Sequence, residues 1–275
     1  MNKKAKEEFI AKNKGNDKIR GRLIRLNRQK LEVRKGKNYA EILFFGDIHL
    51  GYPTCDIERA KKMIQYAIDK RIYLMLMGDL VEAGLKDSIG DSMYRQTLNP
   101  DAQMWEMIDI LTPVAKAGLI LGMHEGNHEA RITKSTSIDI TKIMAKILKV
   151  PYLSHSCWSL LSVDGVRYSL YSTHGTSAAT MEYTQMNAVI KLAKIVLADI
   201  TAYGHTHGLG SKKIITQMFS PKENRIIKKK QYVCLTGAYM EWDKSYAQMK
   251  GYTIADIGSP KAILRSDKHK VNFSL

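Results

Sequence analysis

The chain has 275 residues and a formal net charge of +16, with 44% apolar and 25% charged residues. This composition is typical of a soluble globular protein and excludes a disordered chain. Its longest apolar stretches are far too short to cross a bilayer, so we expect no membrane partner.

Two features of the sequence bear on its compartment. The basic start of the chain is not followed by an apolar segment, and its three cysteines are far apart. We therefore expect no secretory signal and a reducing compartment, the cytoplasm.

The first predicted unit is a basic N-terminal arm, residues 1–38. Residues 1–37 contain 14 Lys or Arg and 4 Asp or Glu. Their few apolar positions suffice for one or two short basic helices but not for an independent core. We expect residues 39–275 to form the globular domain.

Five short apolar runs follow the arm, and their length and bounding glycines indicate buried strands. They span residues 41–45, 72–77, 119–123, 167–172 and 199–203. A polar cluster comes directly after each run. In chain order the clusters are Asp47-Ile48-His49, Gly78-Asp79, Gly126-Asn127-His128-Glu129, His174-Gly175 and Gly204-His205-Thr206-His207. Because open α/β sheets bind ligands at the carboxyl ends of their strands, we expect the clusters to meet at one rim.

Helical patterns lie between these strands. Residues 56–70 place their apolar side chains on one stripe, and Asn99 and Pro100 have the N-cap and N1 chemistry of a helix that runs to about residue 116. Residues 137–148 and 180–197 show the same helical spacing. The alternation of strands and helices indicates an α/β sandwich.

A second basic segment, residues 211–230, is predicted to be a hairpin of two strands around a turn at 220–224. It contains 7 Lys or Arg and 1 acidic residue, and together with the arm it accounts for the whole net charge. Charge concentrated in this way is the electrostatic footprint of a polyanion binder, although such runs also occur as solvated surfaces without a partner. The candidate nucleic-acid contacts are Arg95, Lys212, Lys213, Lys228, Lys229 and Lys230.

The five clusters share the donor groups of a metal site. Carboxylates, imidazoles and one carboxamide suit Mn, Fe, Zn or Co, and the thiolates of a structural zinc site are missing. Seven candidate ligands are too many for one such ion, so we expect two ions with a carboxylate between them. The candidates are Asp47, His49, Asp79, Asn127, His174, His205 and His207.

The ordered set Asp-x-His, Gly-Asp, Gly-Asn-His-Glu, His-Gly and Gly-His-Thr-His resembles the calcineurin-like metallophosphoesterase superfamily over residues 47–207. The resemblance implies an αββα sandwich with a dinuclear site at the carboxyl ends of its strands. Manganese suits such a site best, and Fe, Zn, Co or Mg are alternatives. The implied ligands of one metal are Asp47, His49 and His207, those of the other are Asn127, His174 and His205, and Asp79 is the bridge.

The resemblance also implies a mechanism. A hydroxide held between the ions would attack phosphorus in line, and His128 would donate a proton to the leaving oxygen. Glu129 or Glu82 would orient His128.

Two departures from the motifs of known subfamilies narrow the choice of subfamily for this chain. Protein phosphatases of the superfamily have Gly-Asp-x-Val-Asp-Arg-Gly, whereas residues 78–84 read Gly-Asp-Leu-Val-Glu-Ala-Gly and so lack the arginine that grips the substrate phosphate. Exonuclease subunits of break-repair complexes have histidine at the position of Glu82 and a DNA-binding cap domain, but only 68 residues follow His207. The insertion-like loop over residues 85–100 resembles that of small phosphoesterases carried by phages, which would place the protein in a host cytoplasm.

These observations favour a phosphodiesterase that hydrolyses nucleic acid, with DNA as the expected partner. One alternative is a phosphoesterase acting on a nucleotide or cyclic nucleotide. The other is a nucleic-acid-binding protein without catalytic activity.

Overall fold

The computed structural model describes residues 18–19, 22–23, 26–86, 88, 92–243, 248, 254 and 256–275. Two six-stranded sheets make up its centre, and a separate pair of very short strands, β1 (Lys18–Ile19) and β2 (Arg22–Leu23), precedes them. In the part of the chain that is described, no helix is long and apolar enough to cross a membrane.

Sheet I has the strand order β14-β13-β4-β5-β6-β7. Its strands are β4 (Tyr39–Phe45), β5 (Tyr73–Leu76), β6 (Ile120–His124), β7 (Tyr152–Ser154), β13 (Lys261–Arg265) and β14 (Val271–Ser274). Strands β4 to β7 run parallel, whereas β13 and β14 are antiparallel additions at one edge. The carboxyl ends of β4, β5 and β6 therefore lie at one edge of the sheet.

Sheet II has the strand order β11-β12-β10-β9-β8-β3. Its strands are β3 (Leu26–Leu31), β8 (Ser156–Val163), β9 (Val166–Thr173), β10 (Ile200–Tyr203), β11 (Leu209–Ser220) and β12 (Arg225–Thr236). Strands β9, β10 and β12 run parallel, and β11 pairs antiparallel with β12. The polar clusters that follow β9 and β10 therefore lie at the same edge of sheet II.

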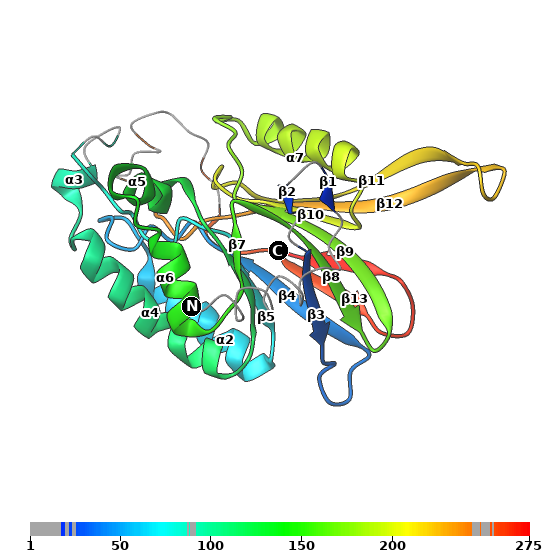
Figure 1. The fold of residues 1–275 in the computed structure, drawn as a ribbon, viewed down its shortest axis with the longest axis horizontal. Coiled ribbons are helices and arrows are strands. Elements are labelled where there is room, and N and C mark those ends of the chain that lie inside the picture. Colours follow the sequence, from blue (N-terminus) through cyan, green and yellow to red (C-terminus); the bar gives the residue numbers. More distant parts are fainter. Residues whose placement is uncertain are drawn as a thin grey trace.

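Helices cover the outer faces of the two sheets (Figure 1). The helices are α2 (Ile57–Lys70), α3 (Ser92–Arg95), α4 (Pro100–Lys116), α5 (Asn127–Thr136), α6 (Ile140–Leu148) and α7 (Glu182–Val196). Helices α2, α4 and α6 pack on the side of sheet I, and α7 packs on β10 and β12 of sheet II. The αββα sandwich predicted from the sequence is confirmed.

Local chemistry explains where the predicted helices begin. The Asp56 side chain accepts a hydrogen bond from the backbone of Arg59 (3.0 Å) and caps α2. Asn99 caps α4 in the same way, with Pro100 in the first helical turn. Each cap satisfies a backbone N–H that the helix itself leaves without a partner.

The N-terminal arm differs from its prediction where it is described. One or two short basic helices were expected within the arm, at no stated residues, and residues 26–31 form strand β3, which pairs in parallel with β8. Leu31 is buried in the main core, and the side chain of Asn27 donates to the carbonyl of Leu121 across 3.1 Å. This part of the arm is therefore built into sheet II, while residues 1–17, 20–21 and 24–25 lie outside the described residues.

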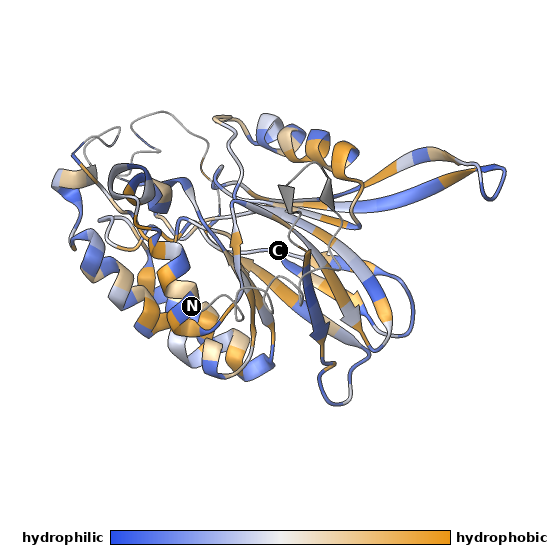
Figure 2. Ribbon diagram, in the orientation of Figure 1, coloured by the Kyte–Doolittle hydropathy of each residue, from blue (hydrophilic) through white to orange (hydrophobic). Residues whose placement is uncertain are grey.

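Strands β11 and β12 confirm the predicted hairpin. They pair over twelve residues each, from Leu209 opposite Thr236 to Ser220 opposite Arg225, and project from the body (Figure 1). The projecting half of β12 combines Lys228, Lys229 and Lys230 with the apolar Ile226 and Ile227, and Figure 2 shows both hydrophilic and apolar stretches along the hairpin. The turn end of the hairpin, with Lys222 and Arg225, is the part of its charge that lies farthest along the projection.

Candidate metal centre

The five polar clusters meet where the strands of both sheets end. The loop after β4 lies along the loop after β5, because Asp47 N donates to Gly78 O (2.9 Å) and Ile48 N donates to Asp79 O (2.8 Å). The loop after β10 joins them through His205 N, which donates to Asp47 Oδ1 across 3.1 Å. Backbone hydrogen bonds, and not only side chains, thus hold the candidate ligands together.

Glycine permits the close approach of two of these loops. A Cβ at Gly78 would lie 2.6 Å from Gly126 N, and one at Gly126 would lie 2.1 Å from Asp79 Oδ1. Neither position has room for a side chain. The glycines of the Gly-Asp and Gly-Asn-His-Glu clusters are therefore required by the packing of the site.

Most of the candidate ligands have an unusual backbone conformation. Left-handed φ values are rare for residues with a Cβ and store strain of about 1–2 kcal/mol each. Five of the seven candidates have them: Asp47 (49°), His49 (55°), Asp79 (48°), His205 (68°) and His207 (57°). Strain concentrated at one place is typical of a functional site.

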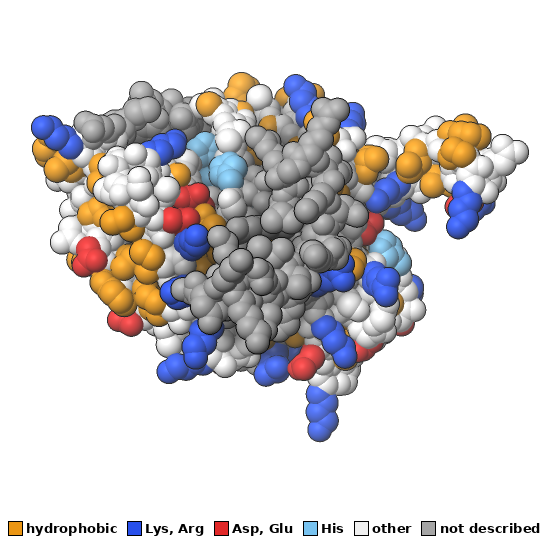
Figure 3. All heavy atoms as spheres, in the orientation of Figure 1, with side chains coloured by type: hydrophobic (Ala, Val, Ile, Leu, Met, Phe, Trp, Pro, Cys, Tyr) orange, Lys and Arg blue, Asp and Glu red, His pale blue; other side chains and the backbone are white. Residues whose placement is uncertain are grey.

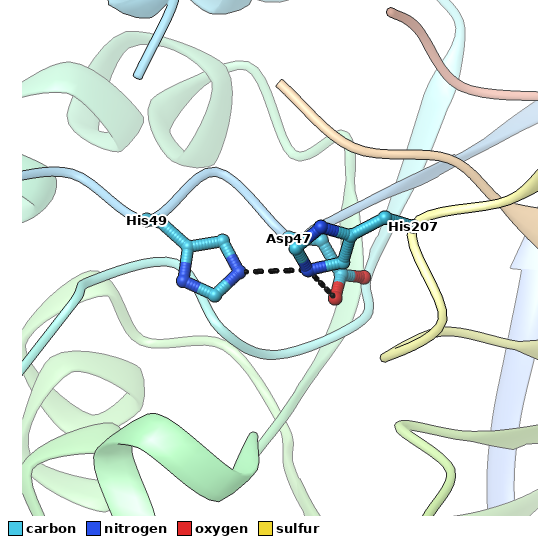
Figure 4. Close-up of side chains that lie close together, drawn as sticks. All are labelled: Asp47, His49 and His207. Atoms are coloured by element: carbon cyan, nitrogen blue, oxygen red, sulfur yellow. Dashed lines mark hydrogen bonds and ion pairs between the residues drawn. The ribbon is translucent and has the colours of Figure 1, made fainter. Parts of the chain in front are cut away.

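The first group of ligand atoms comes from Asp47, His49 and His207, whose donor atoms all lie within 4.8 Å of one another (Figure 4). The Nε2 atoms of His49 and His207 are 3.1 Å apart, and His207 Nε2 is 3.5 Å from Asp47 Oδ1. Two nitrogen ligands at right angles on one ion, each about 2.1 Å from it, would lie about 3 Å apart. The spacing fits a shared cation.

The second group comes from Asp79, His174 and His205, with Asn127 beside it. His174 Nε2 lies 3.2 Å from Asp79 Oδ2 and 2.9 Å from Asn127 Oδ1. The Nδ1 atom of His205 is buried and has no hydrogen-bond partner among the described residues. A buried ring nitrogen without a partner is destabilising unless it binds something.

The hydrogen bonds of two histidines fix which ring nitrogen faces the site. Nδ1 of His174 donates to the carbonyl of Met77 (2.9 Å), so its Nε2 lone pair faces the oxygens of Asp79 and Asn127. Nδ1 of His49 lies 3.0 Å from Glu82 Oε2, which leaves Nε2 facing His207. Lone pairs that converge on one point repel one another unless a cation or a proton lies between them. The donor set therefore fits a metal, with Glu82 as the carboxylate that orients a ligand histidine.

The pKa values of the free protein agree with this interpretation. Burial raises the pKa of Asp47 to about 8 and lowers the pKa of His205 to about 4. Burial also lowers the pKa of His207 well below its ordinary value. Burial would lower the pKa of His174 as well, but the carboxylates of Asp79 and Asp47 outweigh it and raise that pKa to about 10. Imidazoles bind metal in their neutral form. In the free protein the proton on His174 neutralises part of the carboxylate charge, as a bound cation would.

His128 lies at the edge of the centre and contacts Glu82 and Arg131. Its Nδ1 is 2.9 Å from the backbone oxygen of Glu82 and 3.2 Å from Glu82 Oε2. Its Nε2 is 3.0 Å from Arg131 Nη2 and 3.8 Å from Asp79 Oδ2. Although burial opposes it, the carboxylates of Asp79 and Glu82 raise the pKa of His128. Glu82 therefore contacts both His49 and His128.

Glu129 is placed differently from its expected position beside the His128 ring. Its carboxylate accepts hydrogen bonds from four backbone N–H groups. The donors are Asp79 (3.1 Å), Leu80 (2.7 Å), Val81 (3.3 Å) and Gly126 (3.0 Å). Glu129 therefore fixes the loop that carries Asp79, and of the two carboxylates considered for orienting His128 the structure places Glu82 there.

Sequence reasoning missed Arg131. It lies in the first turns of α5, three residues after His128, and its Nη1 is 3.6 Å from Glu82 Oε1. Side chains three residues apart on a helix lie on the same face. An arginine at this spacing after the Gly-Asn-His-Glu cluster was the available signal.

The six predicted nucleic-acid contacts lie outside the two ligand groups. Lys212, Lys213, Lys228 and Lys230 are exposed on the hairpin. Lys229 contacts the carbonyl of Leu197 and lies 3.8 Å from Asp199 Oδ1, so it is bound to the end of α7. Arg95 lies over the ring of Tyr52, 5.8 Å from its centroid.

Comparison with known proteins finds similarity to solved structures only. No family model matches the chain, and no curated protein matches it. A predicted phosphoesterase from Streptococcus pneumoniae is 16% identical, with a TM-score of 0.38, over 86% of this chain and 88% of that one. A hypothetical protein from Pyrococcus horikoshii is 9% identical, with a TM-score of 0.44, over 86% and 87%. Zinc-bound Vps29 from Entamoeba histolytica is 14% identical, with a TM-score of 0.35, over 85% and 97%.

Fold and site together give a clear structural description. The chain is an αββα sandwich, with histidine and acidic residues that could bind metal at the carboxyl ends of its strands.

Proposed function

We propose that this protein is a dinuclear metal-dependent phosphodiesterase that hydrolyses nucleic acid. The observation that carries the proposal is the meeting of His174 Nε2, Asp79 Oδ2 and Asn127 Oδ1 within 2.9–3.2 Å. Two oxygen acceptors and a ring nitrogen gathered in a buried site need a positive charge between them, which a proton on His174 supplies in the free protein and a metal ion would supply on binding. Metal centres of this composition at the end of an α/β sheet serve hydrolysis.

The proposed ligands follow the two groups. Asp47, His49 and His207 would hold one ion. Asn127, His174 and His205 would hold the other, with Asp79 shared. Manganese is the proposed ion, because the oxygen and imidazole set suits it. When bound, the ions lower the pKa of water and neutralise charge on the phosphate oxygens.

The remaining residues of the site have separate roles. Glu82 holds the Nδ1 side of His128, and at the opposite edge Nε2 accepts from Arg131 Nη2 at 3.0 Å, so Nε2 would carry a proton to a leaving oxygen only once a substrate phosphate draws Arg131 away. Arg131 lies at that edge and supplies a guanidinium, whose planar donors match phosphate oxygens. In this proposal it takes the part of the arginine that is missing after Glu82.

Nucleic acid is the proposed substrate because of where the charge lies. The hairpin presents exposed lysines away from the body, and the arm adds further positive charge. A polyanion that spans these surfaces would release counterions on binding, so its affinity would fall steeply with salt. DNA in the cytoplasm is the proposed partner, in keeping with the free cysteines at positions 55, 157 and 234.

A substrate panel tests the proposal. The manganese-loaded protein is offered single-stranded DNA, duplex DNA, RNA, a cyclic nucleotide, a simple phosphodiester and a simple phosphomonoester, with Asp79→Asn as the inactive control. We expect hydrolysis of the polymers to be most efficient and to be lost in the control. Preference for the monoester or the cyclic nucleotide would favour a small-molecule enzyme. Tight binding of DNA without any turnover would favour the non-catalytic alternative.

A further inference from the structure

The hairpin has two different faces, which its register defines. Residues directly opposite each other in an antiparallel pair lie on the same face, and the faces alternate along the strand. Lys213 pairs with Tyr232, Ile215 with Lys230, Gln217 with Lys228 and Phe219 with Ile226. These eight residues form one face, which we call the lysine–aromatic face.

The opposite face packs on the body of the protein along its base, whereas Met218 nearer the tip is exposed. Lys229, Gln231 and Val233 lie on this face. Gln231 Nε2 donates to the carbonyl of Ala193 across 2.9 Å, and Lys229 contacts the carbonyl of Leu197. The run of three lysines at 228–230 is therefore divided, because its middle member binds the end of α7 and the outer two face the other way.

A pocket of about 360 Å³ lies at the base of the lysine–aromatic face, where β11 and β12 meet β14 of the other sheet. It is lined by Ser211, Lys212, Lys213, Tyr232, Lys270, Asn272 and Phe273. The rings of Tyr232 and Phe273 are within 26° of parallel, with centroids 6.4 Å apart. Lys213 shares the face of Tyr232, whereas Lys212 pairs with Val233 on the opposite face. Lysines that line a pocket with two aromatic rings suit a ligand that is both anionic and aromatic.

The far end of the same face is apolar and exposed. Phe219 is 59% exposed and its partner Ile226 is 66% exposed. Figure 3 shows the hairpin standing out from the body with basic side chains along one edge and apolar side chains along the other. An exposed aromatic side chain next to lysines is a stacking platform for a base and does not stabilise the fold itself.

We propose that the lysine–aromatic face and the pocket at its base bind single-stranded nucleic acid. One base stacks on Tyr232 and Phe273 in the pocket, and the backbone follows Lys213, Lys230 and Lys228 toward the tip. Lys228 and Lys230 are two residues apart on one strand, about 7 Å, and so contact successive phosphates of an extended strand. The bases of a duplex are stacked inside it, so they cannot stack on Tyr232 or Phe273.

The proposal rests on the proposed function for its substrate class and adds strand type and location. Leu209 begins β11 two residues after His207, and Lys213 lies about 13 Å further along the strand. A strand bound in the pocket is thus separated from the metal centre by a few nucleotides.

The test measures binding with the metal-free protein in chelator, so that cleavage does not contribute. The probe is a fluorescent DNA strand of about 12 nucleotides, within the range of known single-strand site sizes. The variant carries Lys213→Ala, Lys228→Ala and Lys230→Ala. The control carries Lys116→Ala, Lys142→Ala and Lys146→Ala on helices α4 and α6, which removes the same charge from exposed positions.

We expect the slope of log affinity against log salt to fall by about 2 in the variant, as for three lost phosphate contacts on a single strand. The control keeps the slope of the unmodified protein to within a fraction of a unit. Equal losses in the two triple variants would show a general charge effect and would overturn the proposal.

A second variant tests stacking. Phe273→Leu keeps an apolar side chain in the pocket, and we expect about tenfold weaker binding of the normal strand. A strand of the same length with abasic sites should bind the unmodified protein and Phe273→Leu alike. Tighter binding of duplex DNA, or of vesicles of anionic phospholipid, would overturn the proposal.

The two proposals fail differently. If the protein binds the single strand as described but hydrolyses none of the panel, the binding surface is supported and the phosphodiesterase proposal is rejected. If the protein hydrolyses DNA but the lysine variant binds with unchanged salt dependence, the phosphodiesterase proposal is supported and the binding surface is rejected.

Discussion

The Nε2 atoms of His49 and His207 lie 3.1 Å apart, although the two residues are 158 positions apart in the chain. His49 follows β4 of sheet I and His207 follows β10 of sheet II, so the metal centre joins the two sheets (Figure 4). Because the Glu82 carboxylate holds the Nδ1 side of His49, its Nε2 lone pair faces the site. A cation at this point would bind the two halves of the sandwich to each other.

Divalent metal should therefore stabilise the fold, and Asp79→Asn should abolish much of that effect. A ligand at one hundred times its Kd stabilises the folded state by about 2.7 kcal/mol, which raises Tm by about 5–10 °C in a domain of this size. Thermal melts with and without manganese check this. Asp164→Asn, in the exposed turn between β8 and β9, is the control and should keep the full shift. An unchanged shift in Asp79→Asn would remove Asp79 from the ligand set.

Glu82→Gln should weaken both metal binding and turnover. Its carboxylate is 3.0 Å from His49 Nδ1 and 3.2 Å from His128 Nδ1, and loss of such a partner lowers metal affinity about 10- to 100-fold. Calorimetry of manganese binding measures the first effect, and kcat at saturating metal measures the second. Glu32→Gln removes an exposed carboxylate that pairs with Arg71 at 3.6 Å and should leave both values intact. Normal metal affinity in Glu82→Gln would show that His49 does not depend on it.

Arg131→Ala should lower kcat/KM without changing metal affinity. Its guanidinium is 3.0 Å from His128 Nε2, at the edge where a leaving oxygen would accept its proton. Loss of one donor to a developing negative charge reduces the rate about 100- to 1000-fold. Added guanidinium ions should restore part of the rate in Arg131→Ala. Lys134→Ala on the same helix is the control, and a rate equal to that of the unmodified protein in Arg131→Ala would exclude the role.

His124 should make the fold sensitive to acid. It is buried between Ser154 O (2.9 Å) and Ser172 Oγ (2.7 Å), and burial lowers its pKa to about 4. Since its unfolded pKa is about 6.5, the folded state excludes a proton that the unfolded state binds. Its contribution is complete above pH 6.5 and is lost toward pH 4, by at most about 1.4 kcal/mol per pH unit.

Urea melts of the metal-free protein at pH 7.5 and 4.5 measure this loss. His124→Asn should be less stable at pH 7.5 and should lose less of its stability on acidification. His269→Asn changes an exposed histidine and should behave like the unmodified protein at both values. The interpretation fails if His124→Asn loses as much stability in acid as the unmodified protein.

The sequence predicted which side chains meet at the strand ends better than it predicted the segments around them. The candidate ligands could be found because each follows a short apolar strand, and parallel strands bring their carboxyl ends to one edge whatever their separation in the chain. Strand β3 was missed because Arg28 and Lys30 dominate its composition, whereas its pairing partner β8 lies about 130 residues away. Local pattern carries no information on such a partner.

The lysines at 228–230 and Arg131 show the same limit at the level of single side chains. The sequence identified the charge at 228–230, but only the register of β11 on β12 shows that Lys229 faces α7 while its neighbours do not. Arg131 acquires its place because α5 begins at Asn127, a helix start that the sequence analysis did not predict.

Gly126→Ala should disrupt the metal centre far more than a glycine replacement that strains the backbone elsewhere. The added Cβ would lie 2.1 Å from Asp79 Oδ1 and 2.2 Å from Asp79 N, closer than real contacts allow, so the loop that carries Asp79 would have to shift. That loop also carries three of the four backbone donors to Glu129, and their loss would leave a buried carboxylate poorly satisfied.

Gly118→Ala is the control, because its φ of +70° makes alanine strained while nothing lies within 4 Å of the added atom, whereas at Gly126 the φ of −89° is ordinary and only the contacts of the added atom matter. We expect Gly118→Ala to lose about 1–2 kcal/mol of stability and keep its metal. Gly126→Ala should lose metal affinity by more than tenfold whatever its free energy of unfolding. The reason is that Asp79 joins the two ligand groups, and its shift would separate them. Metal titration of both folded variants by calorimetry distinguishes them, and equal metal affinities would show that the close approach of Gly126 to Asp79 does not position the centre.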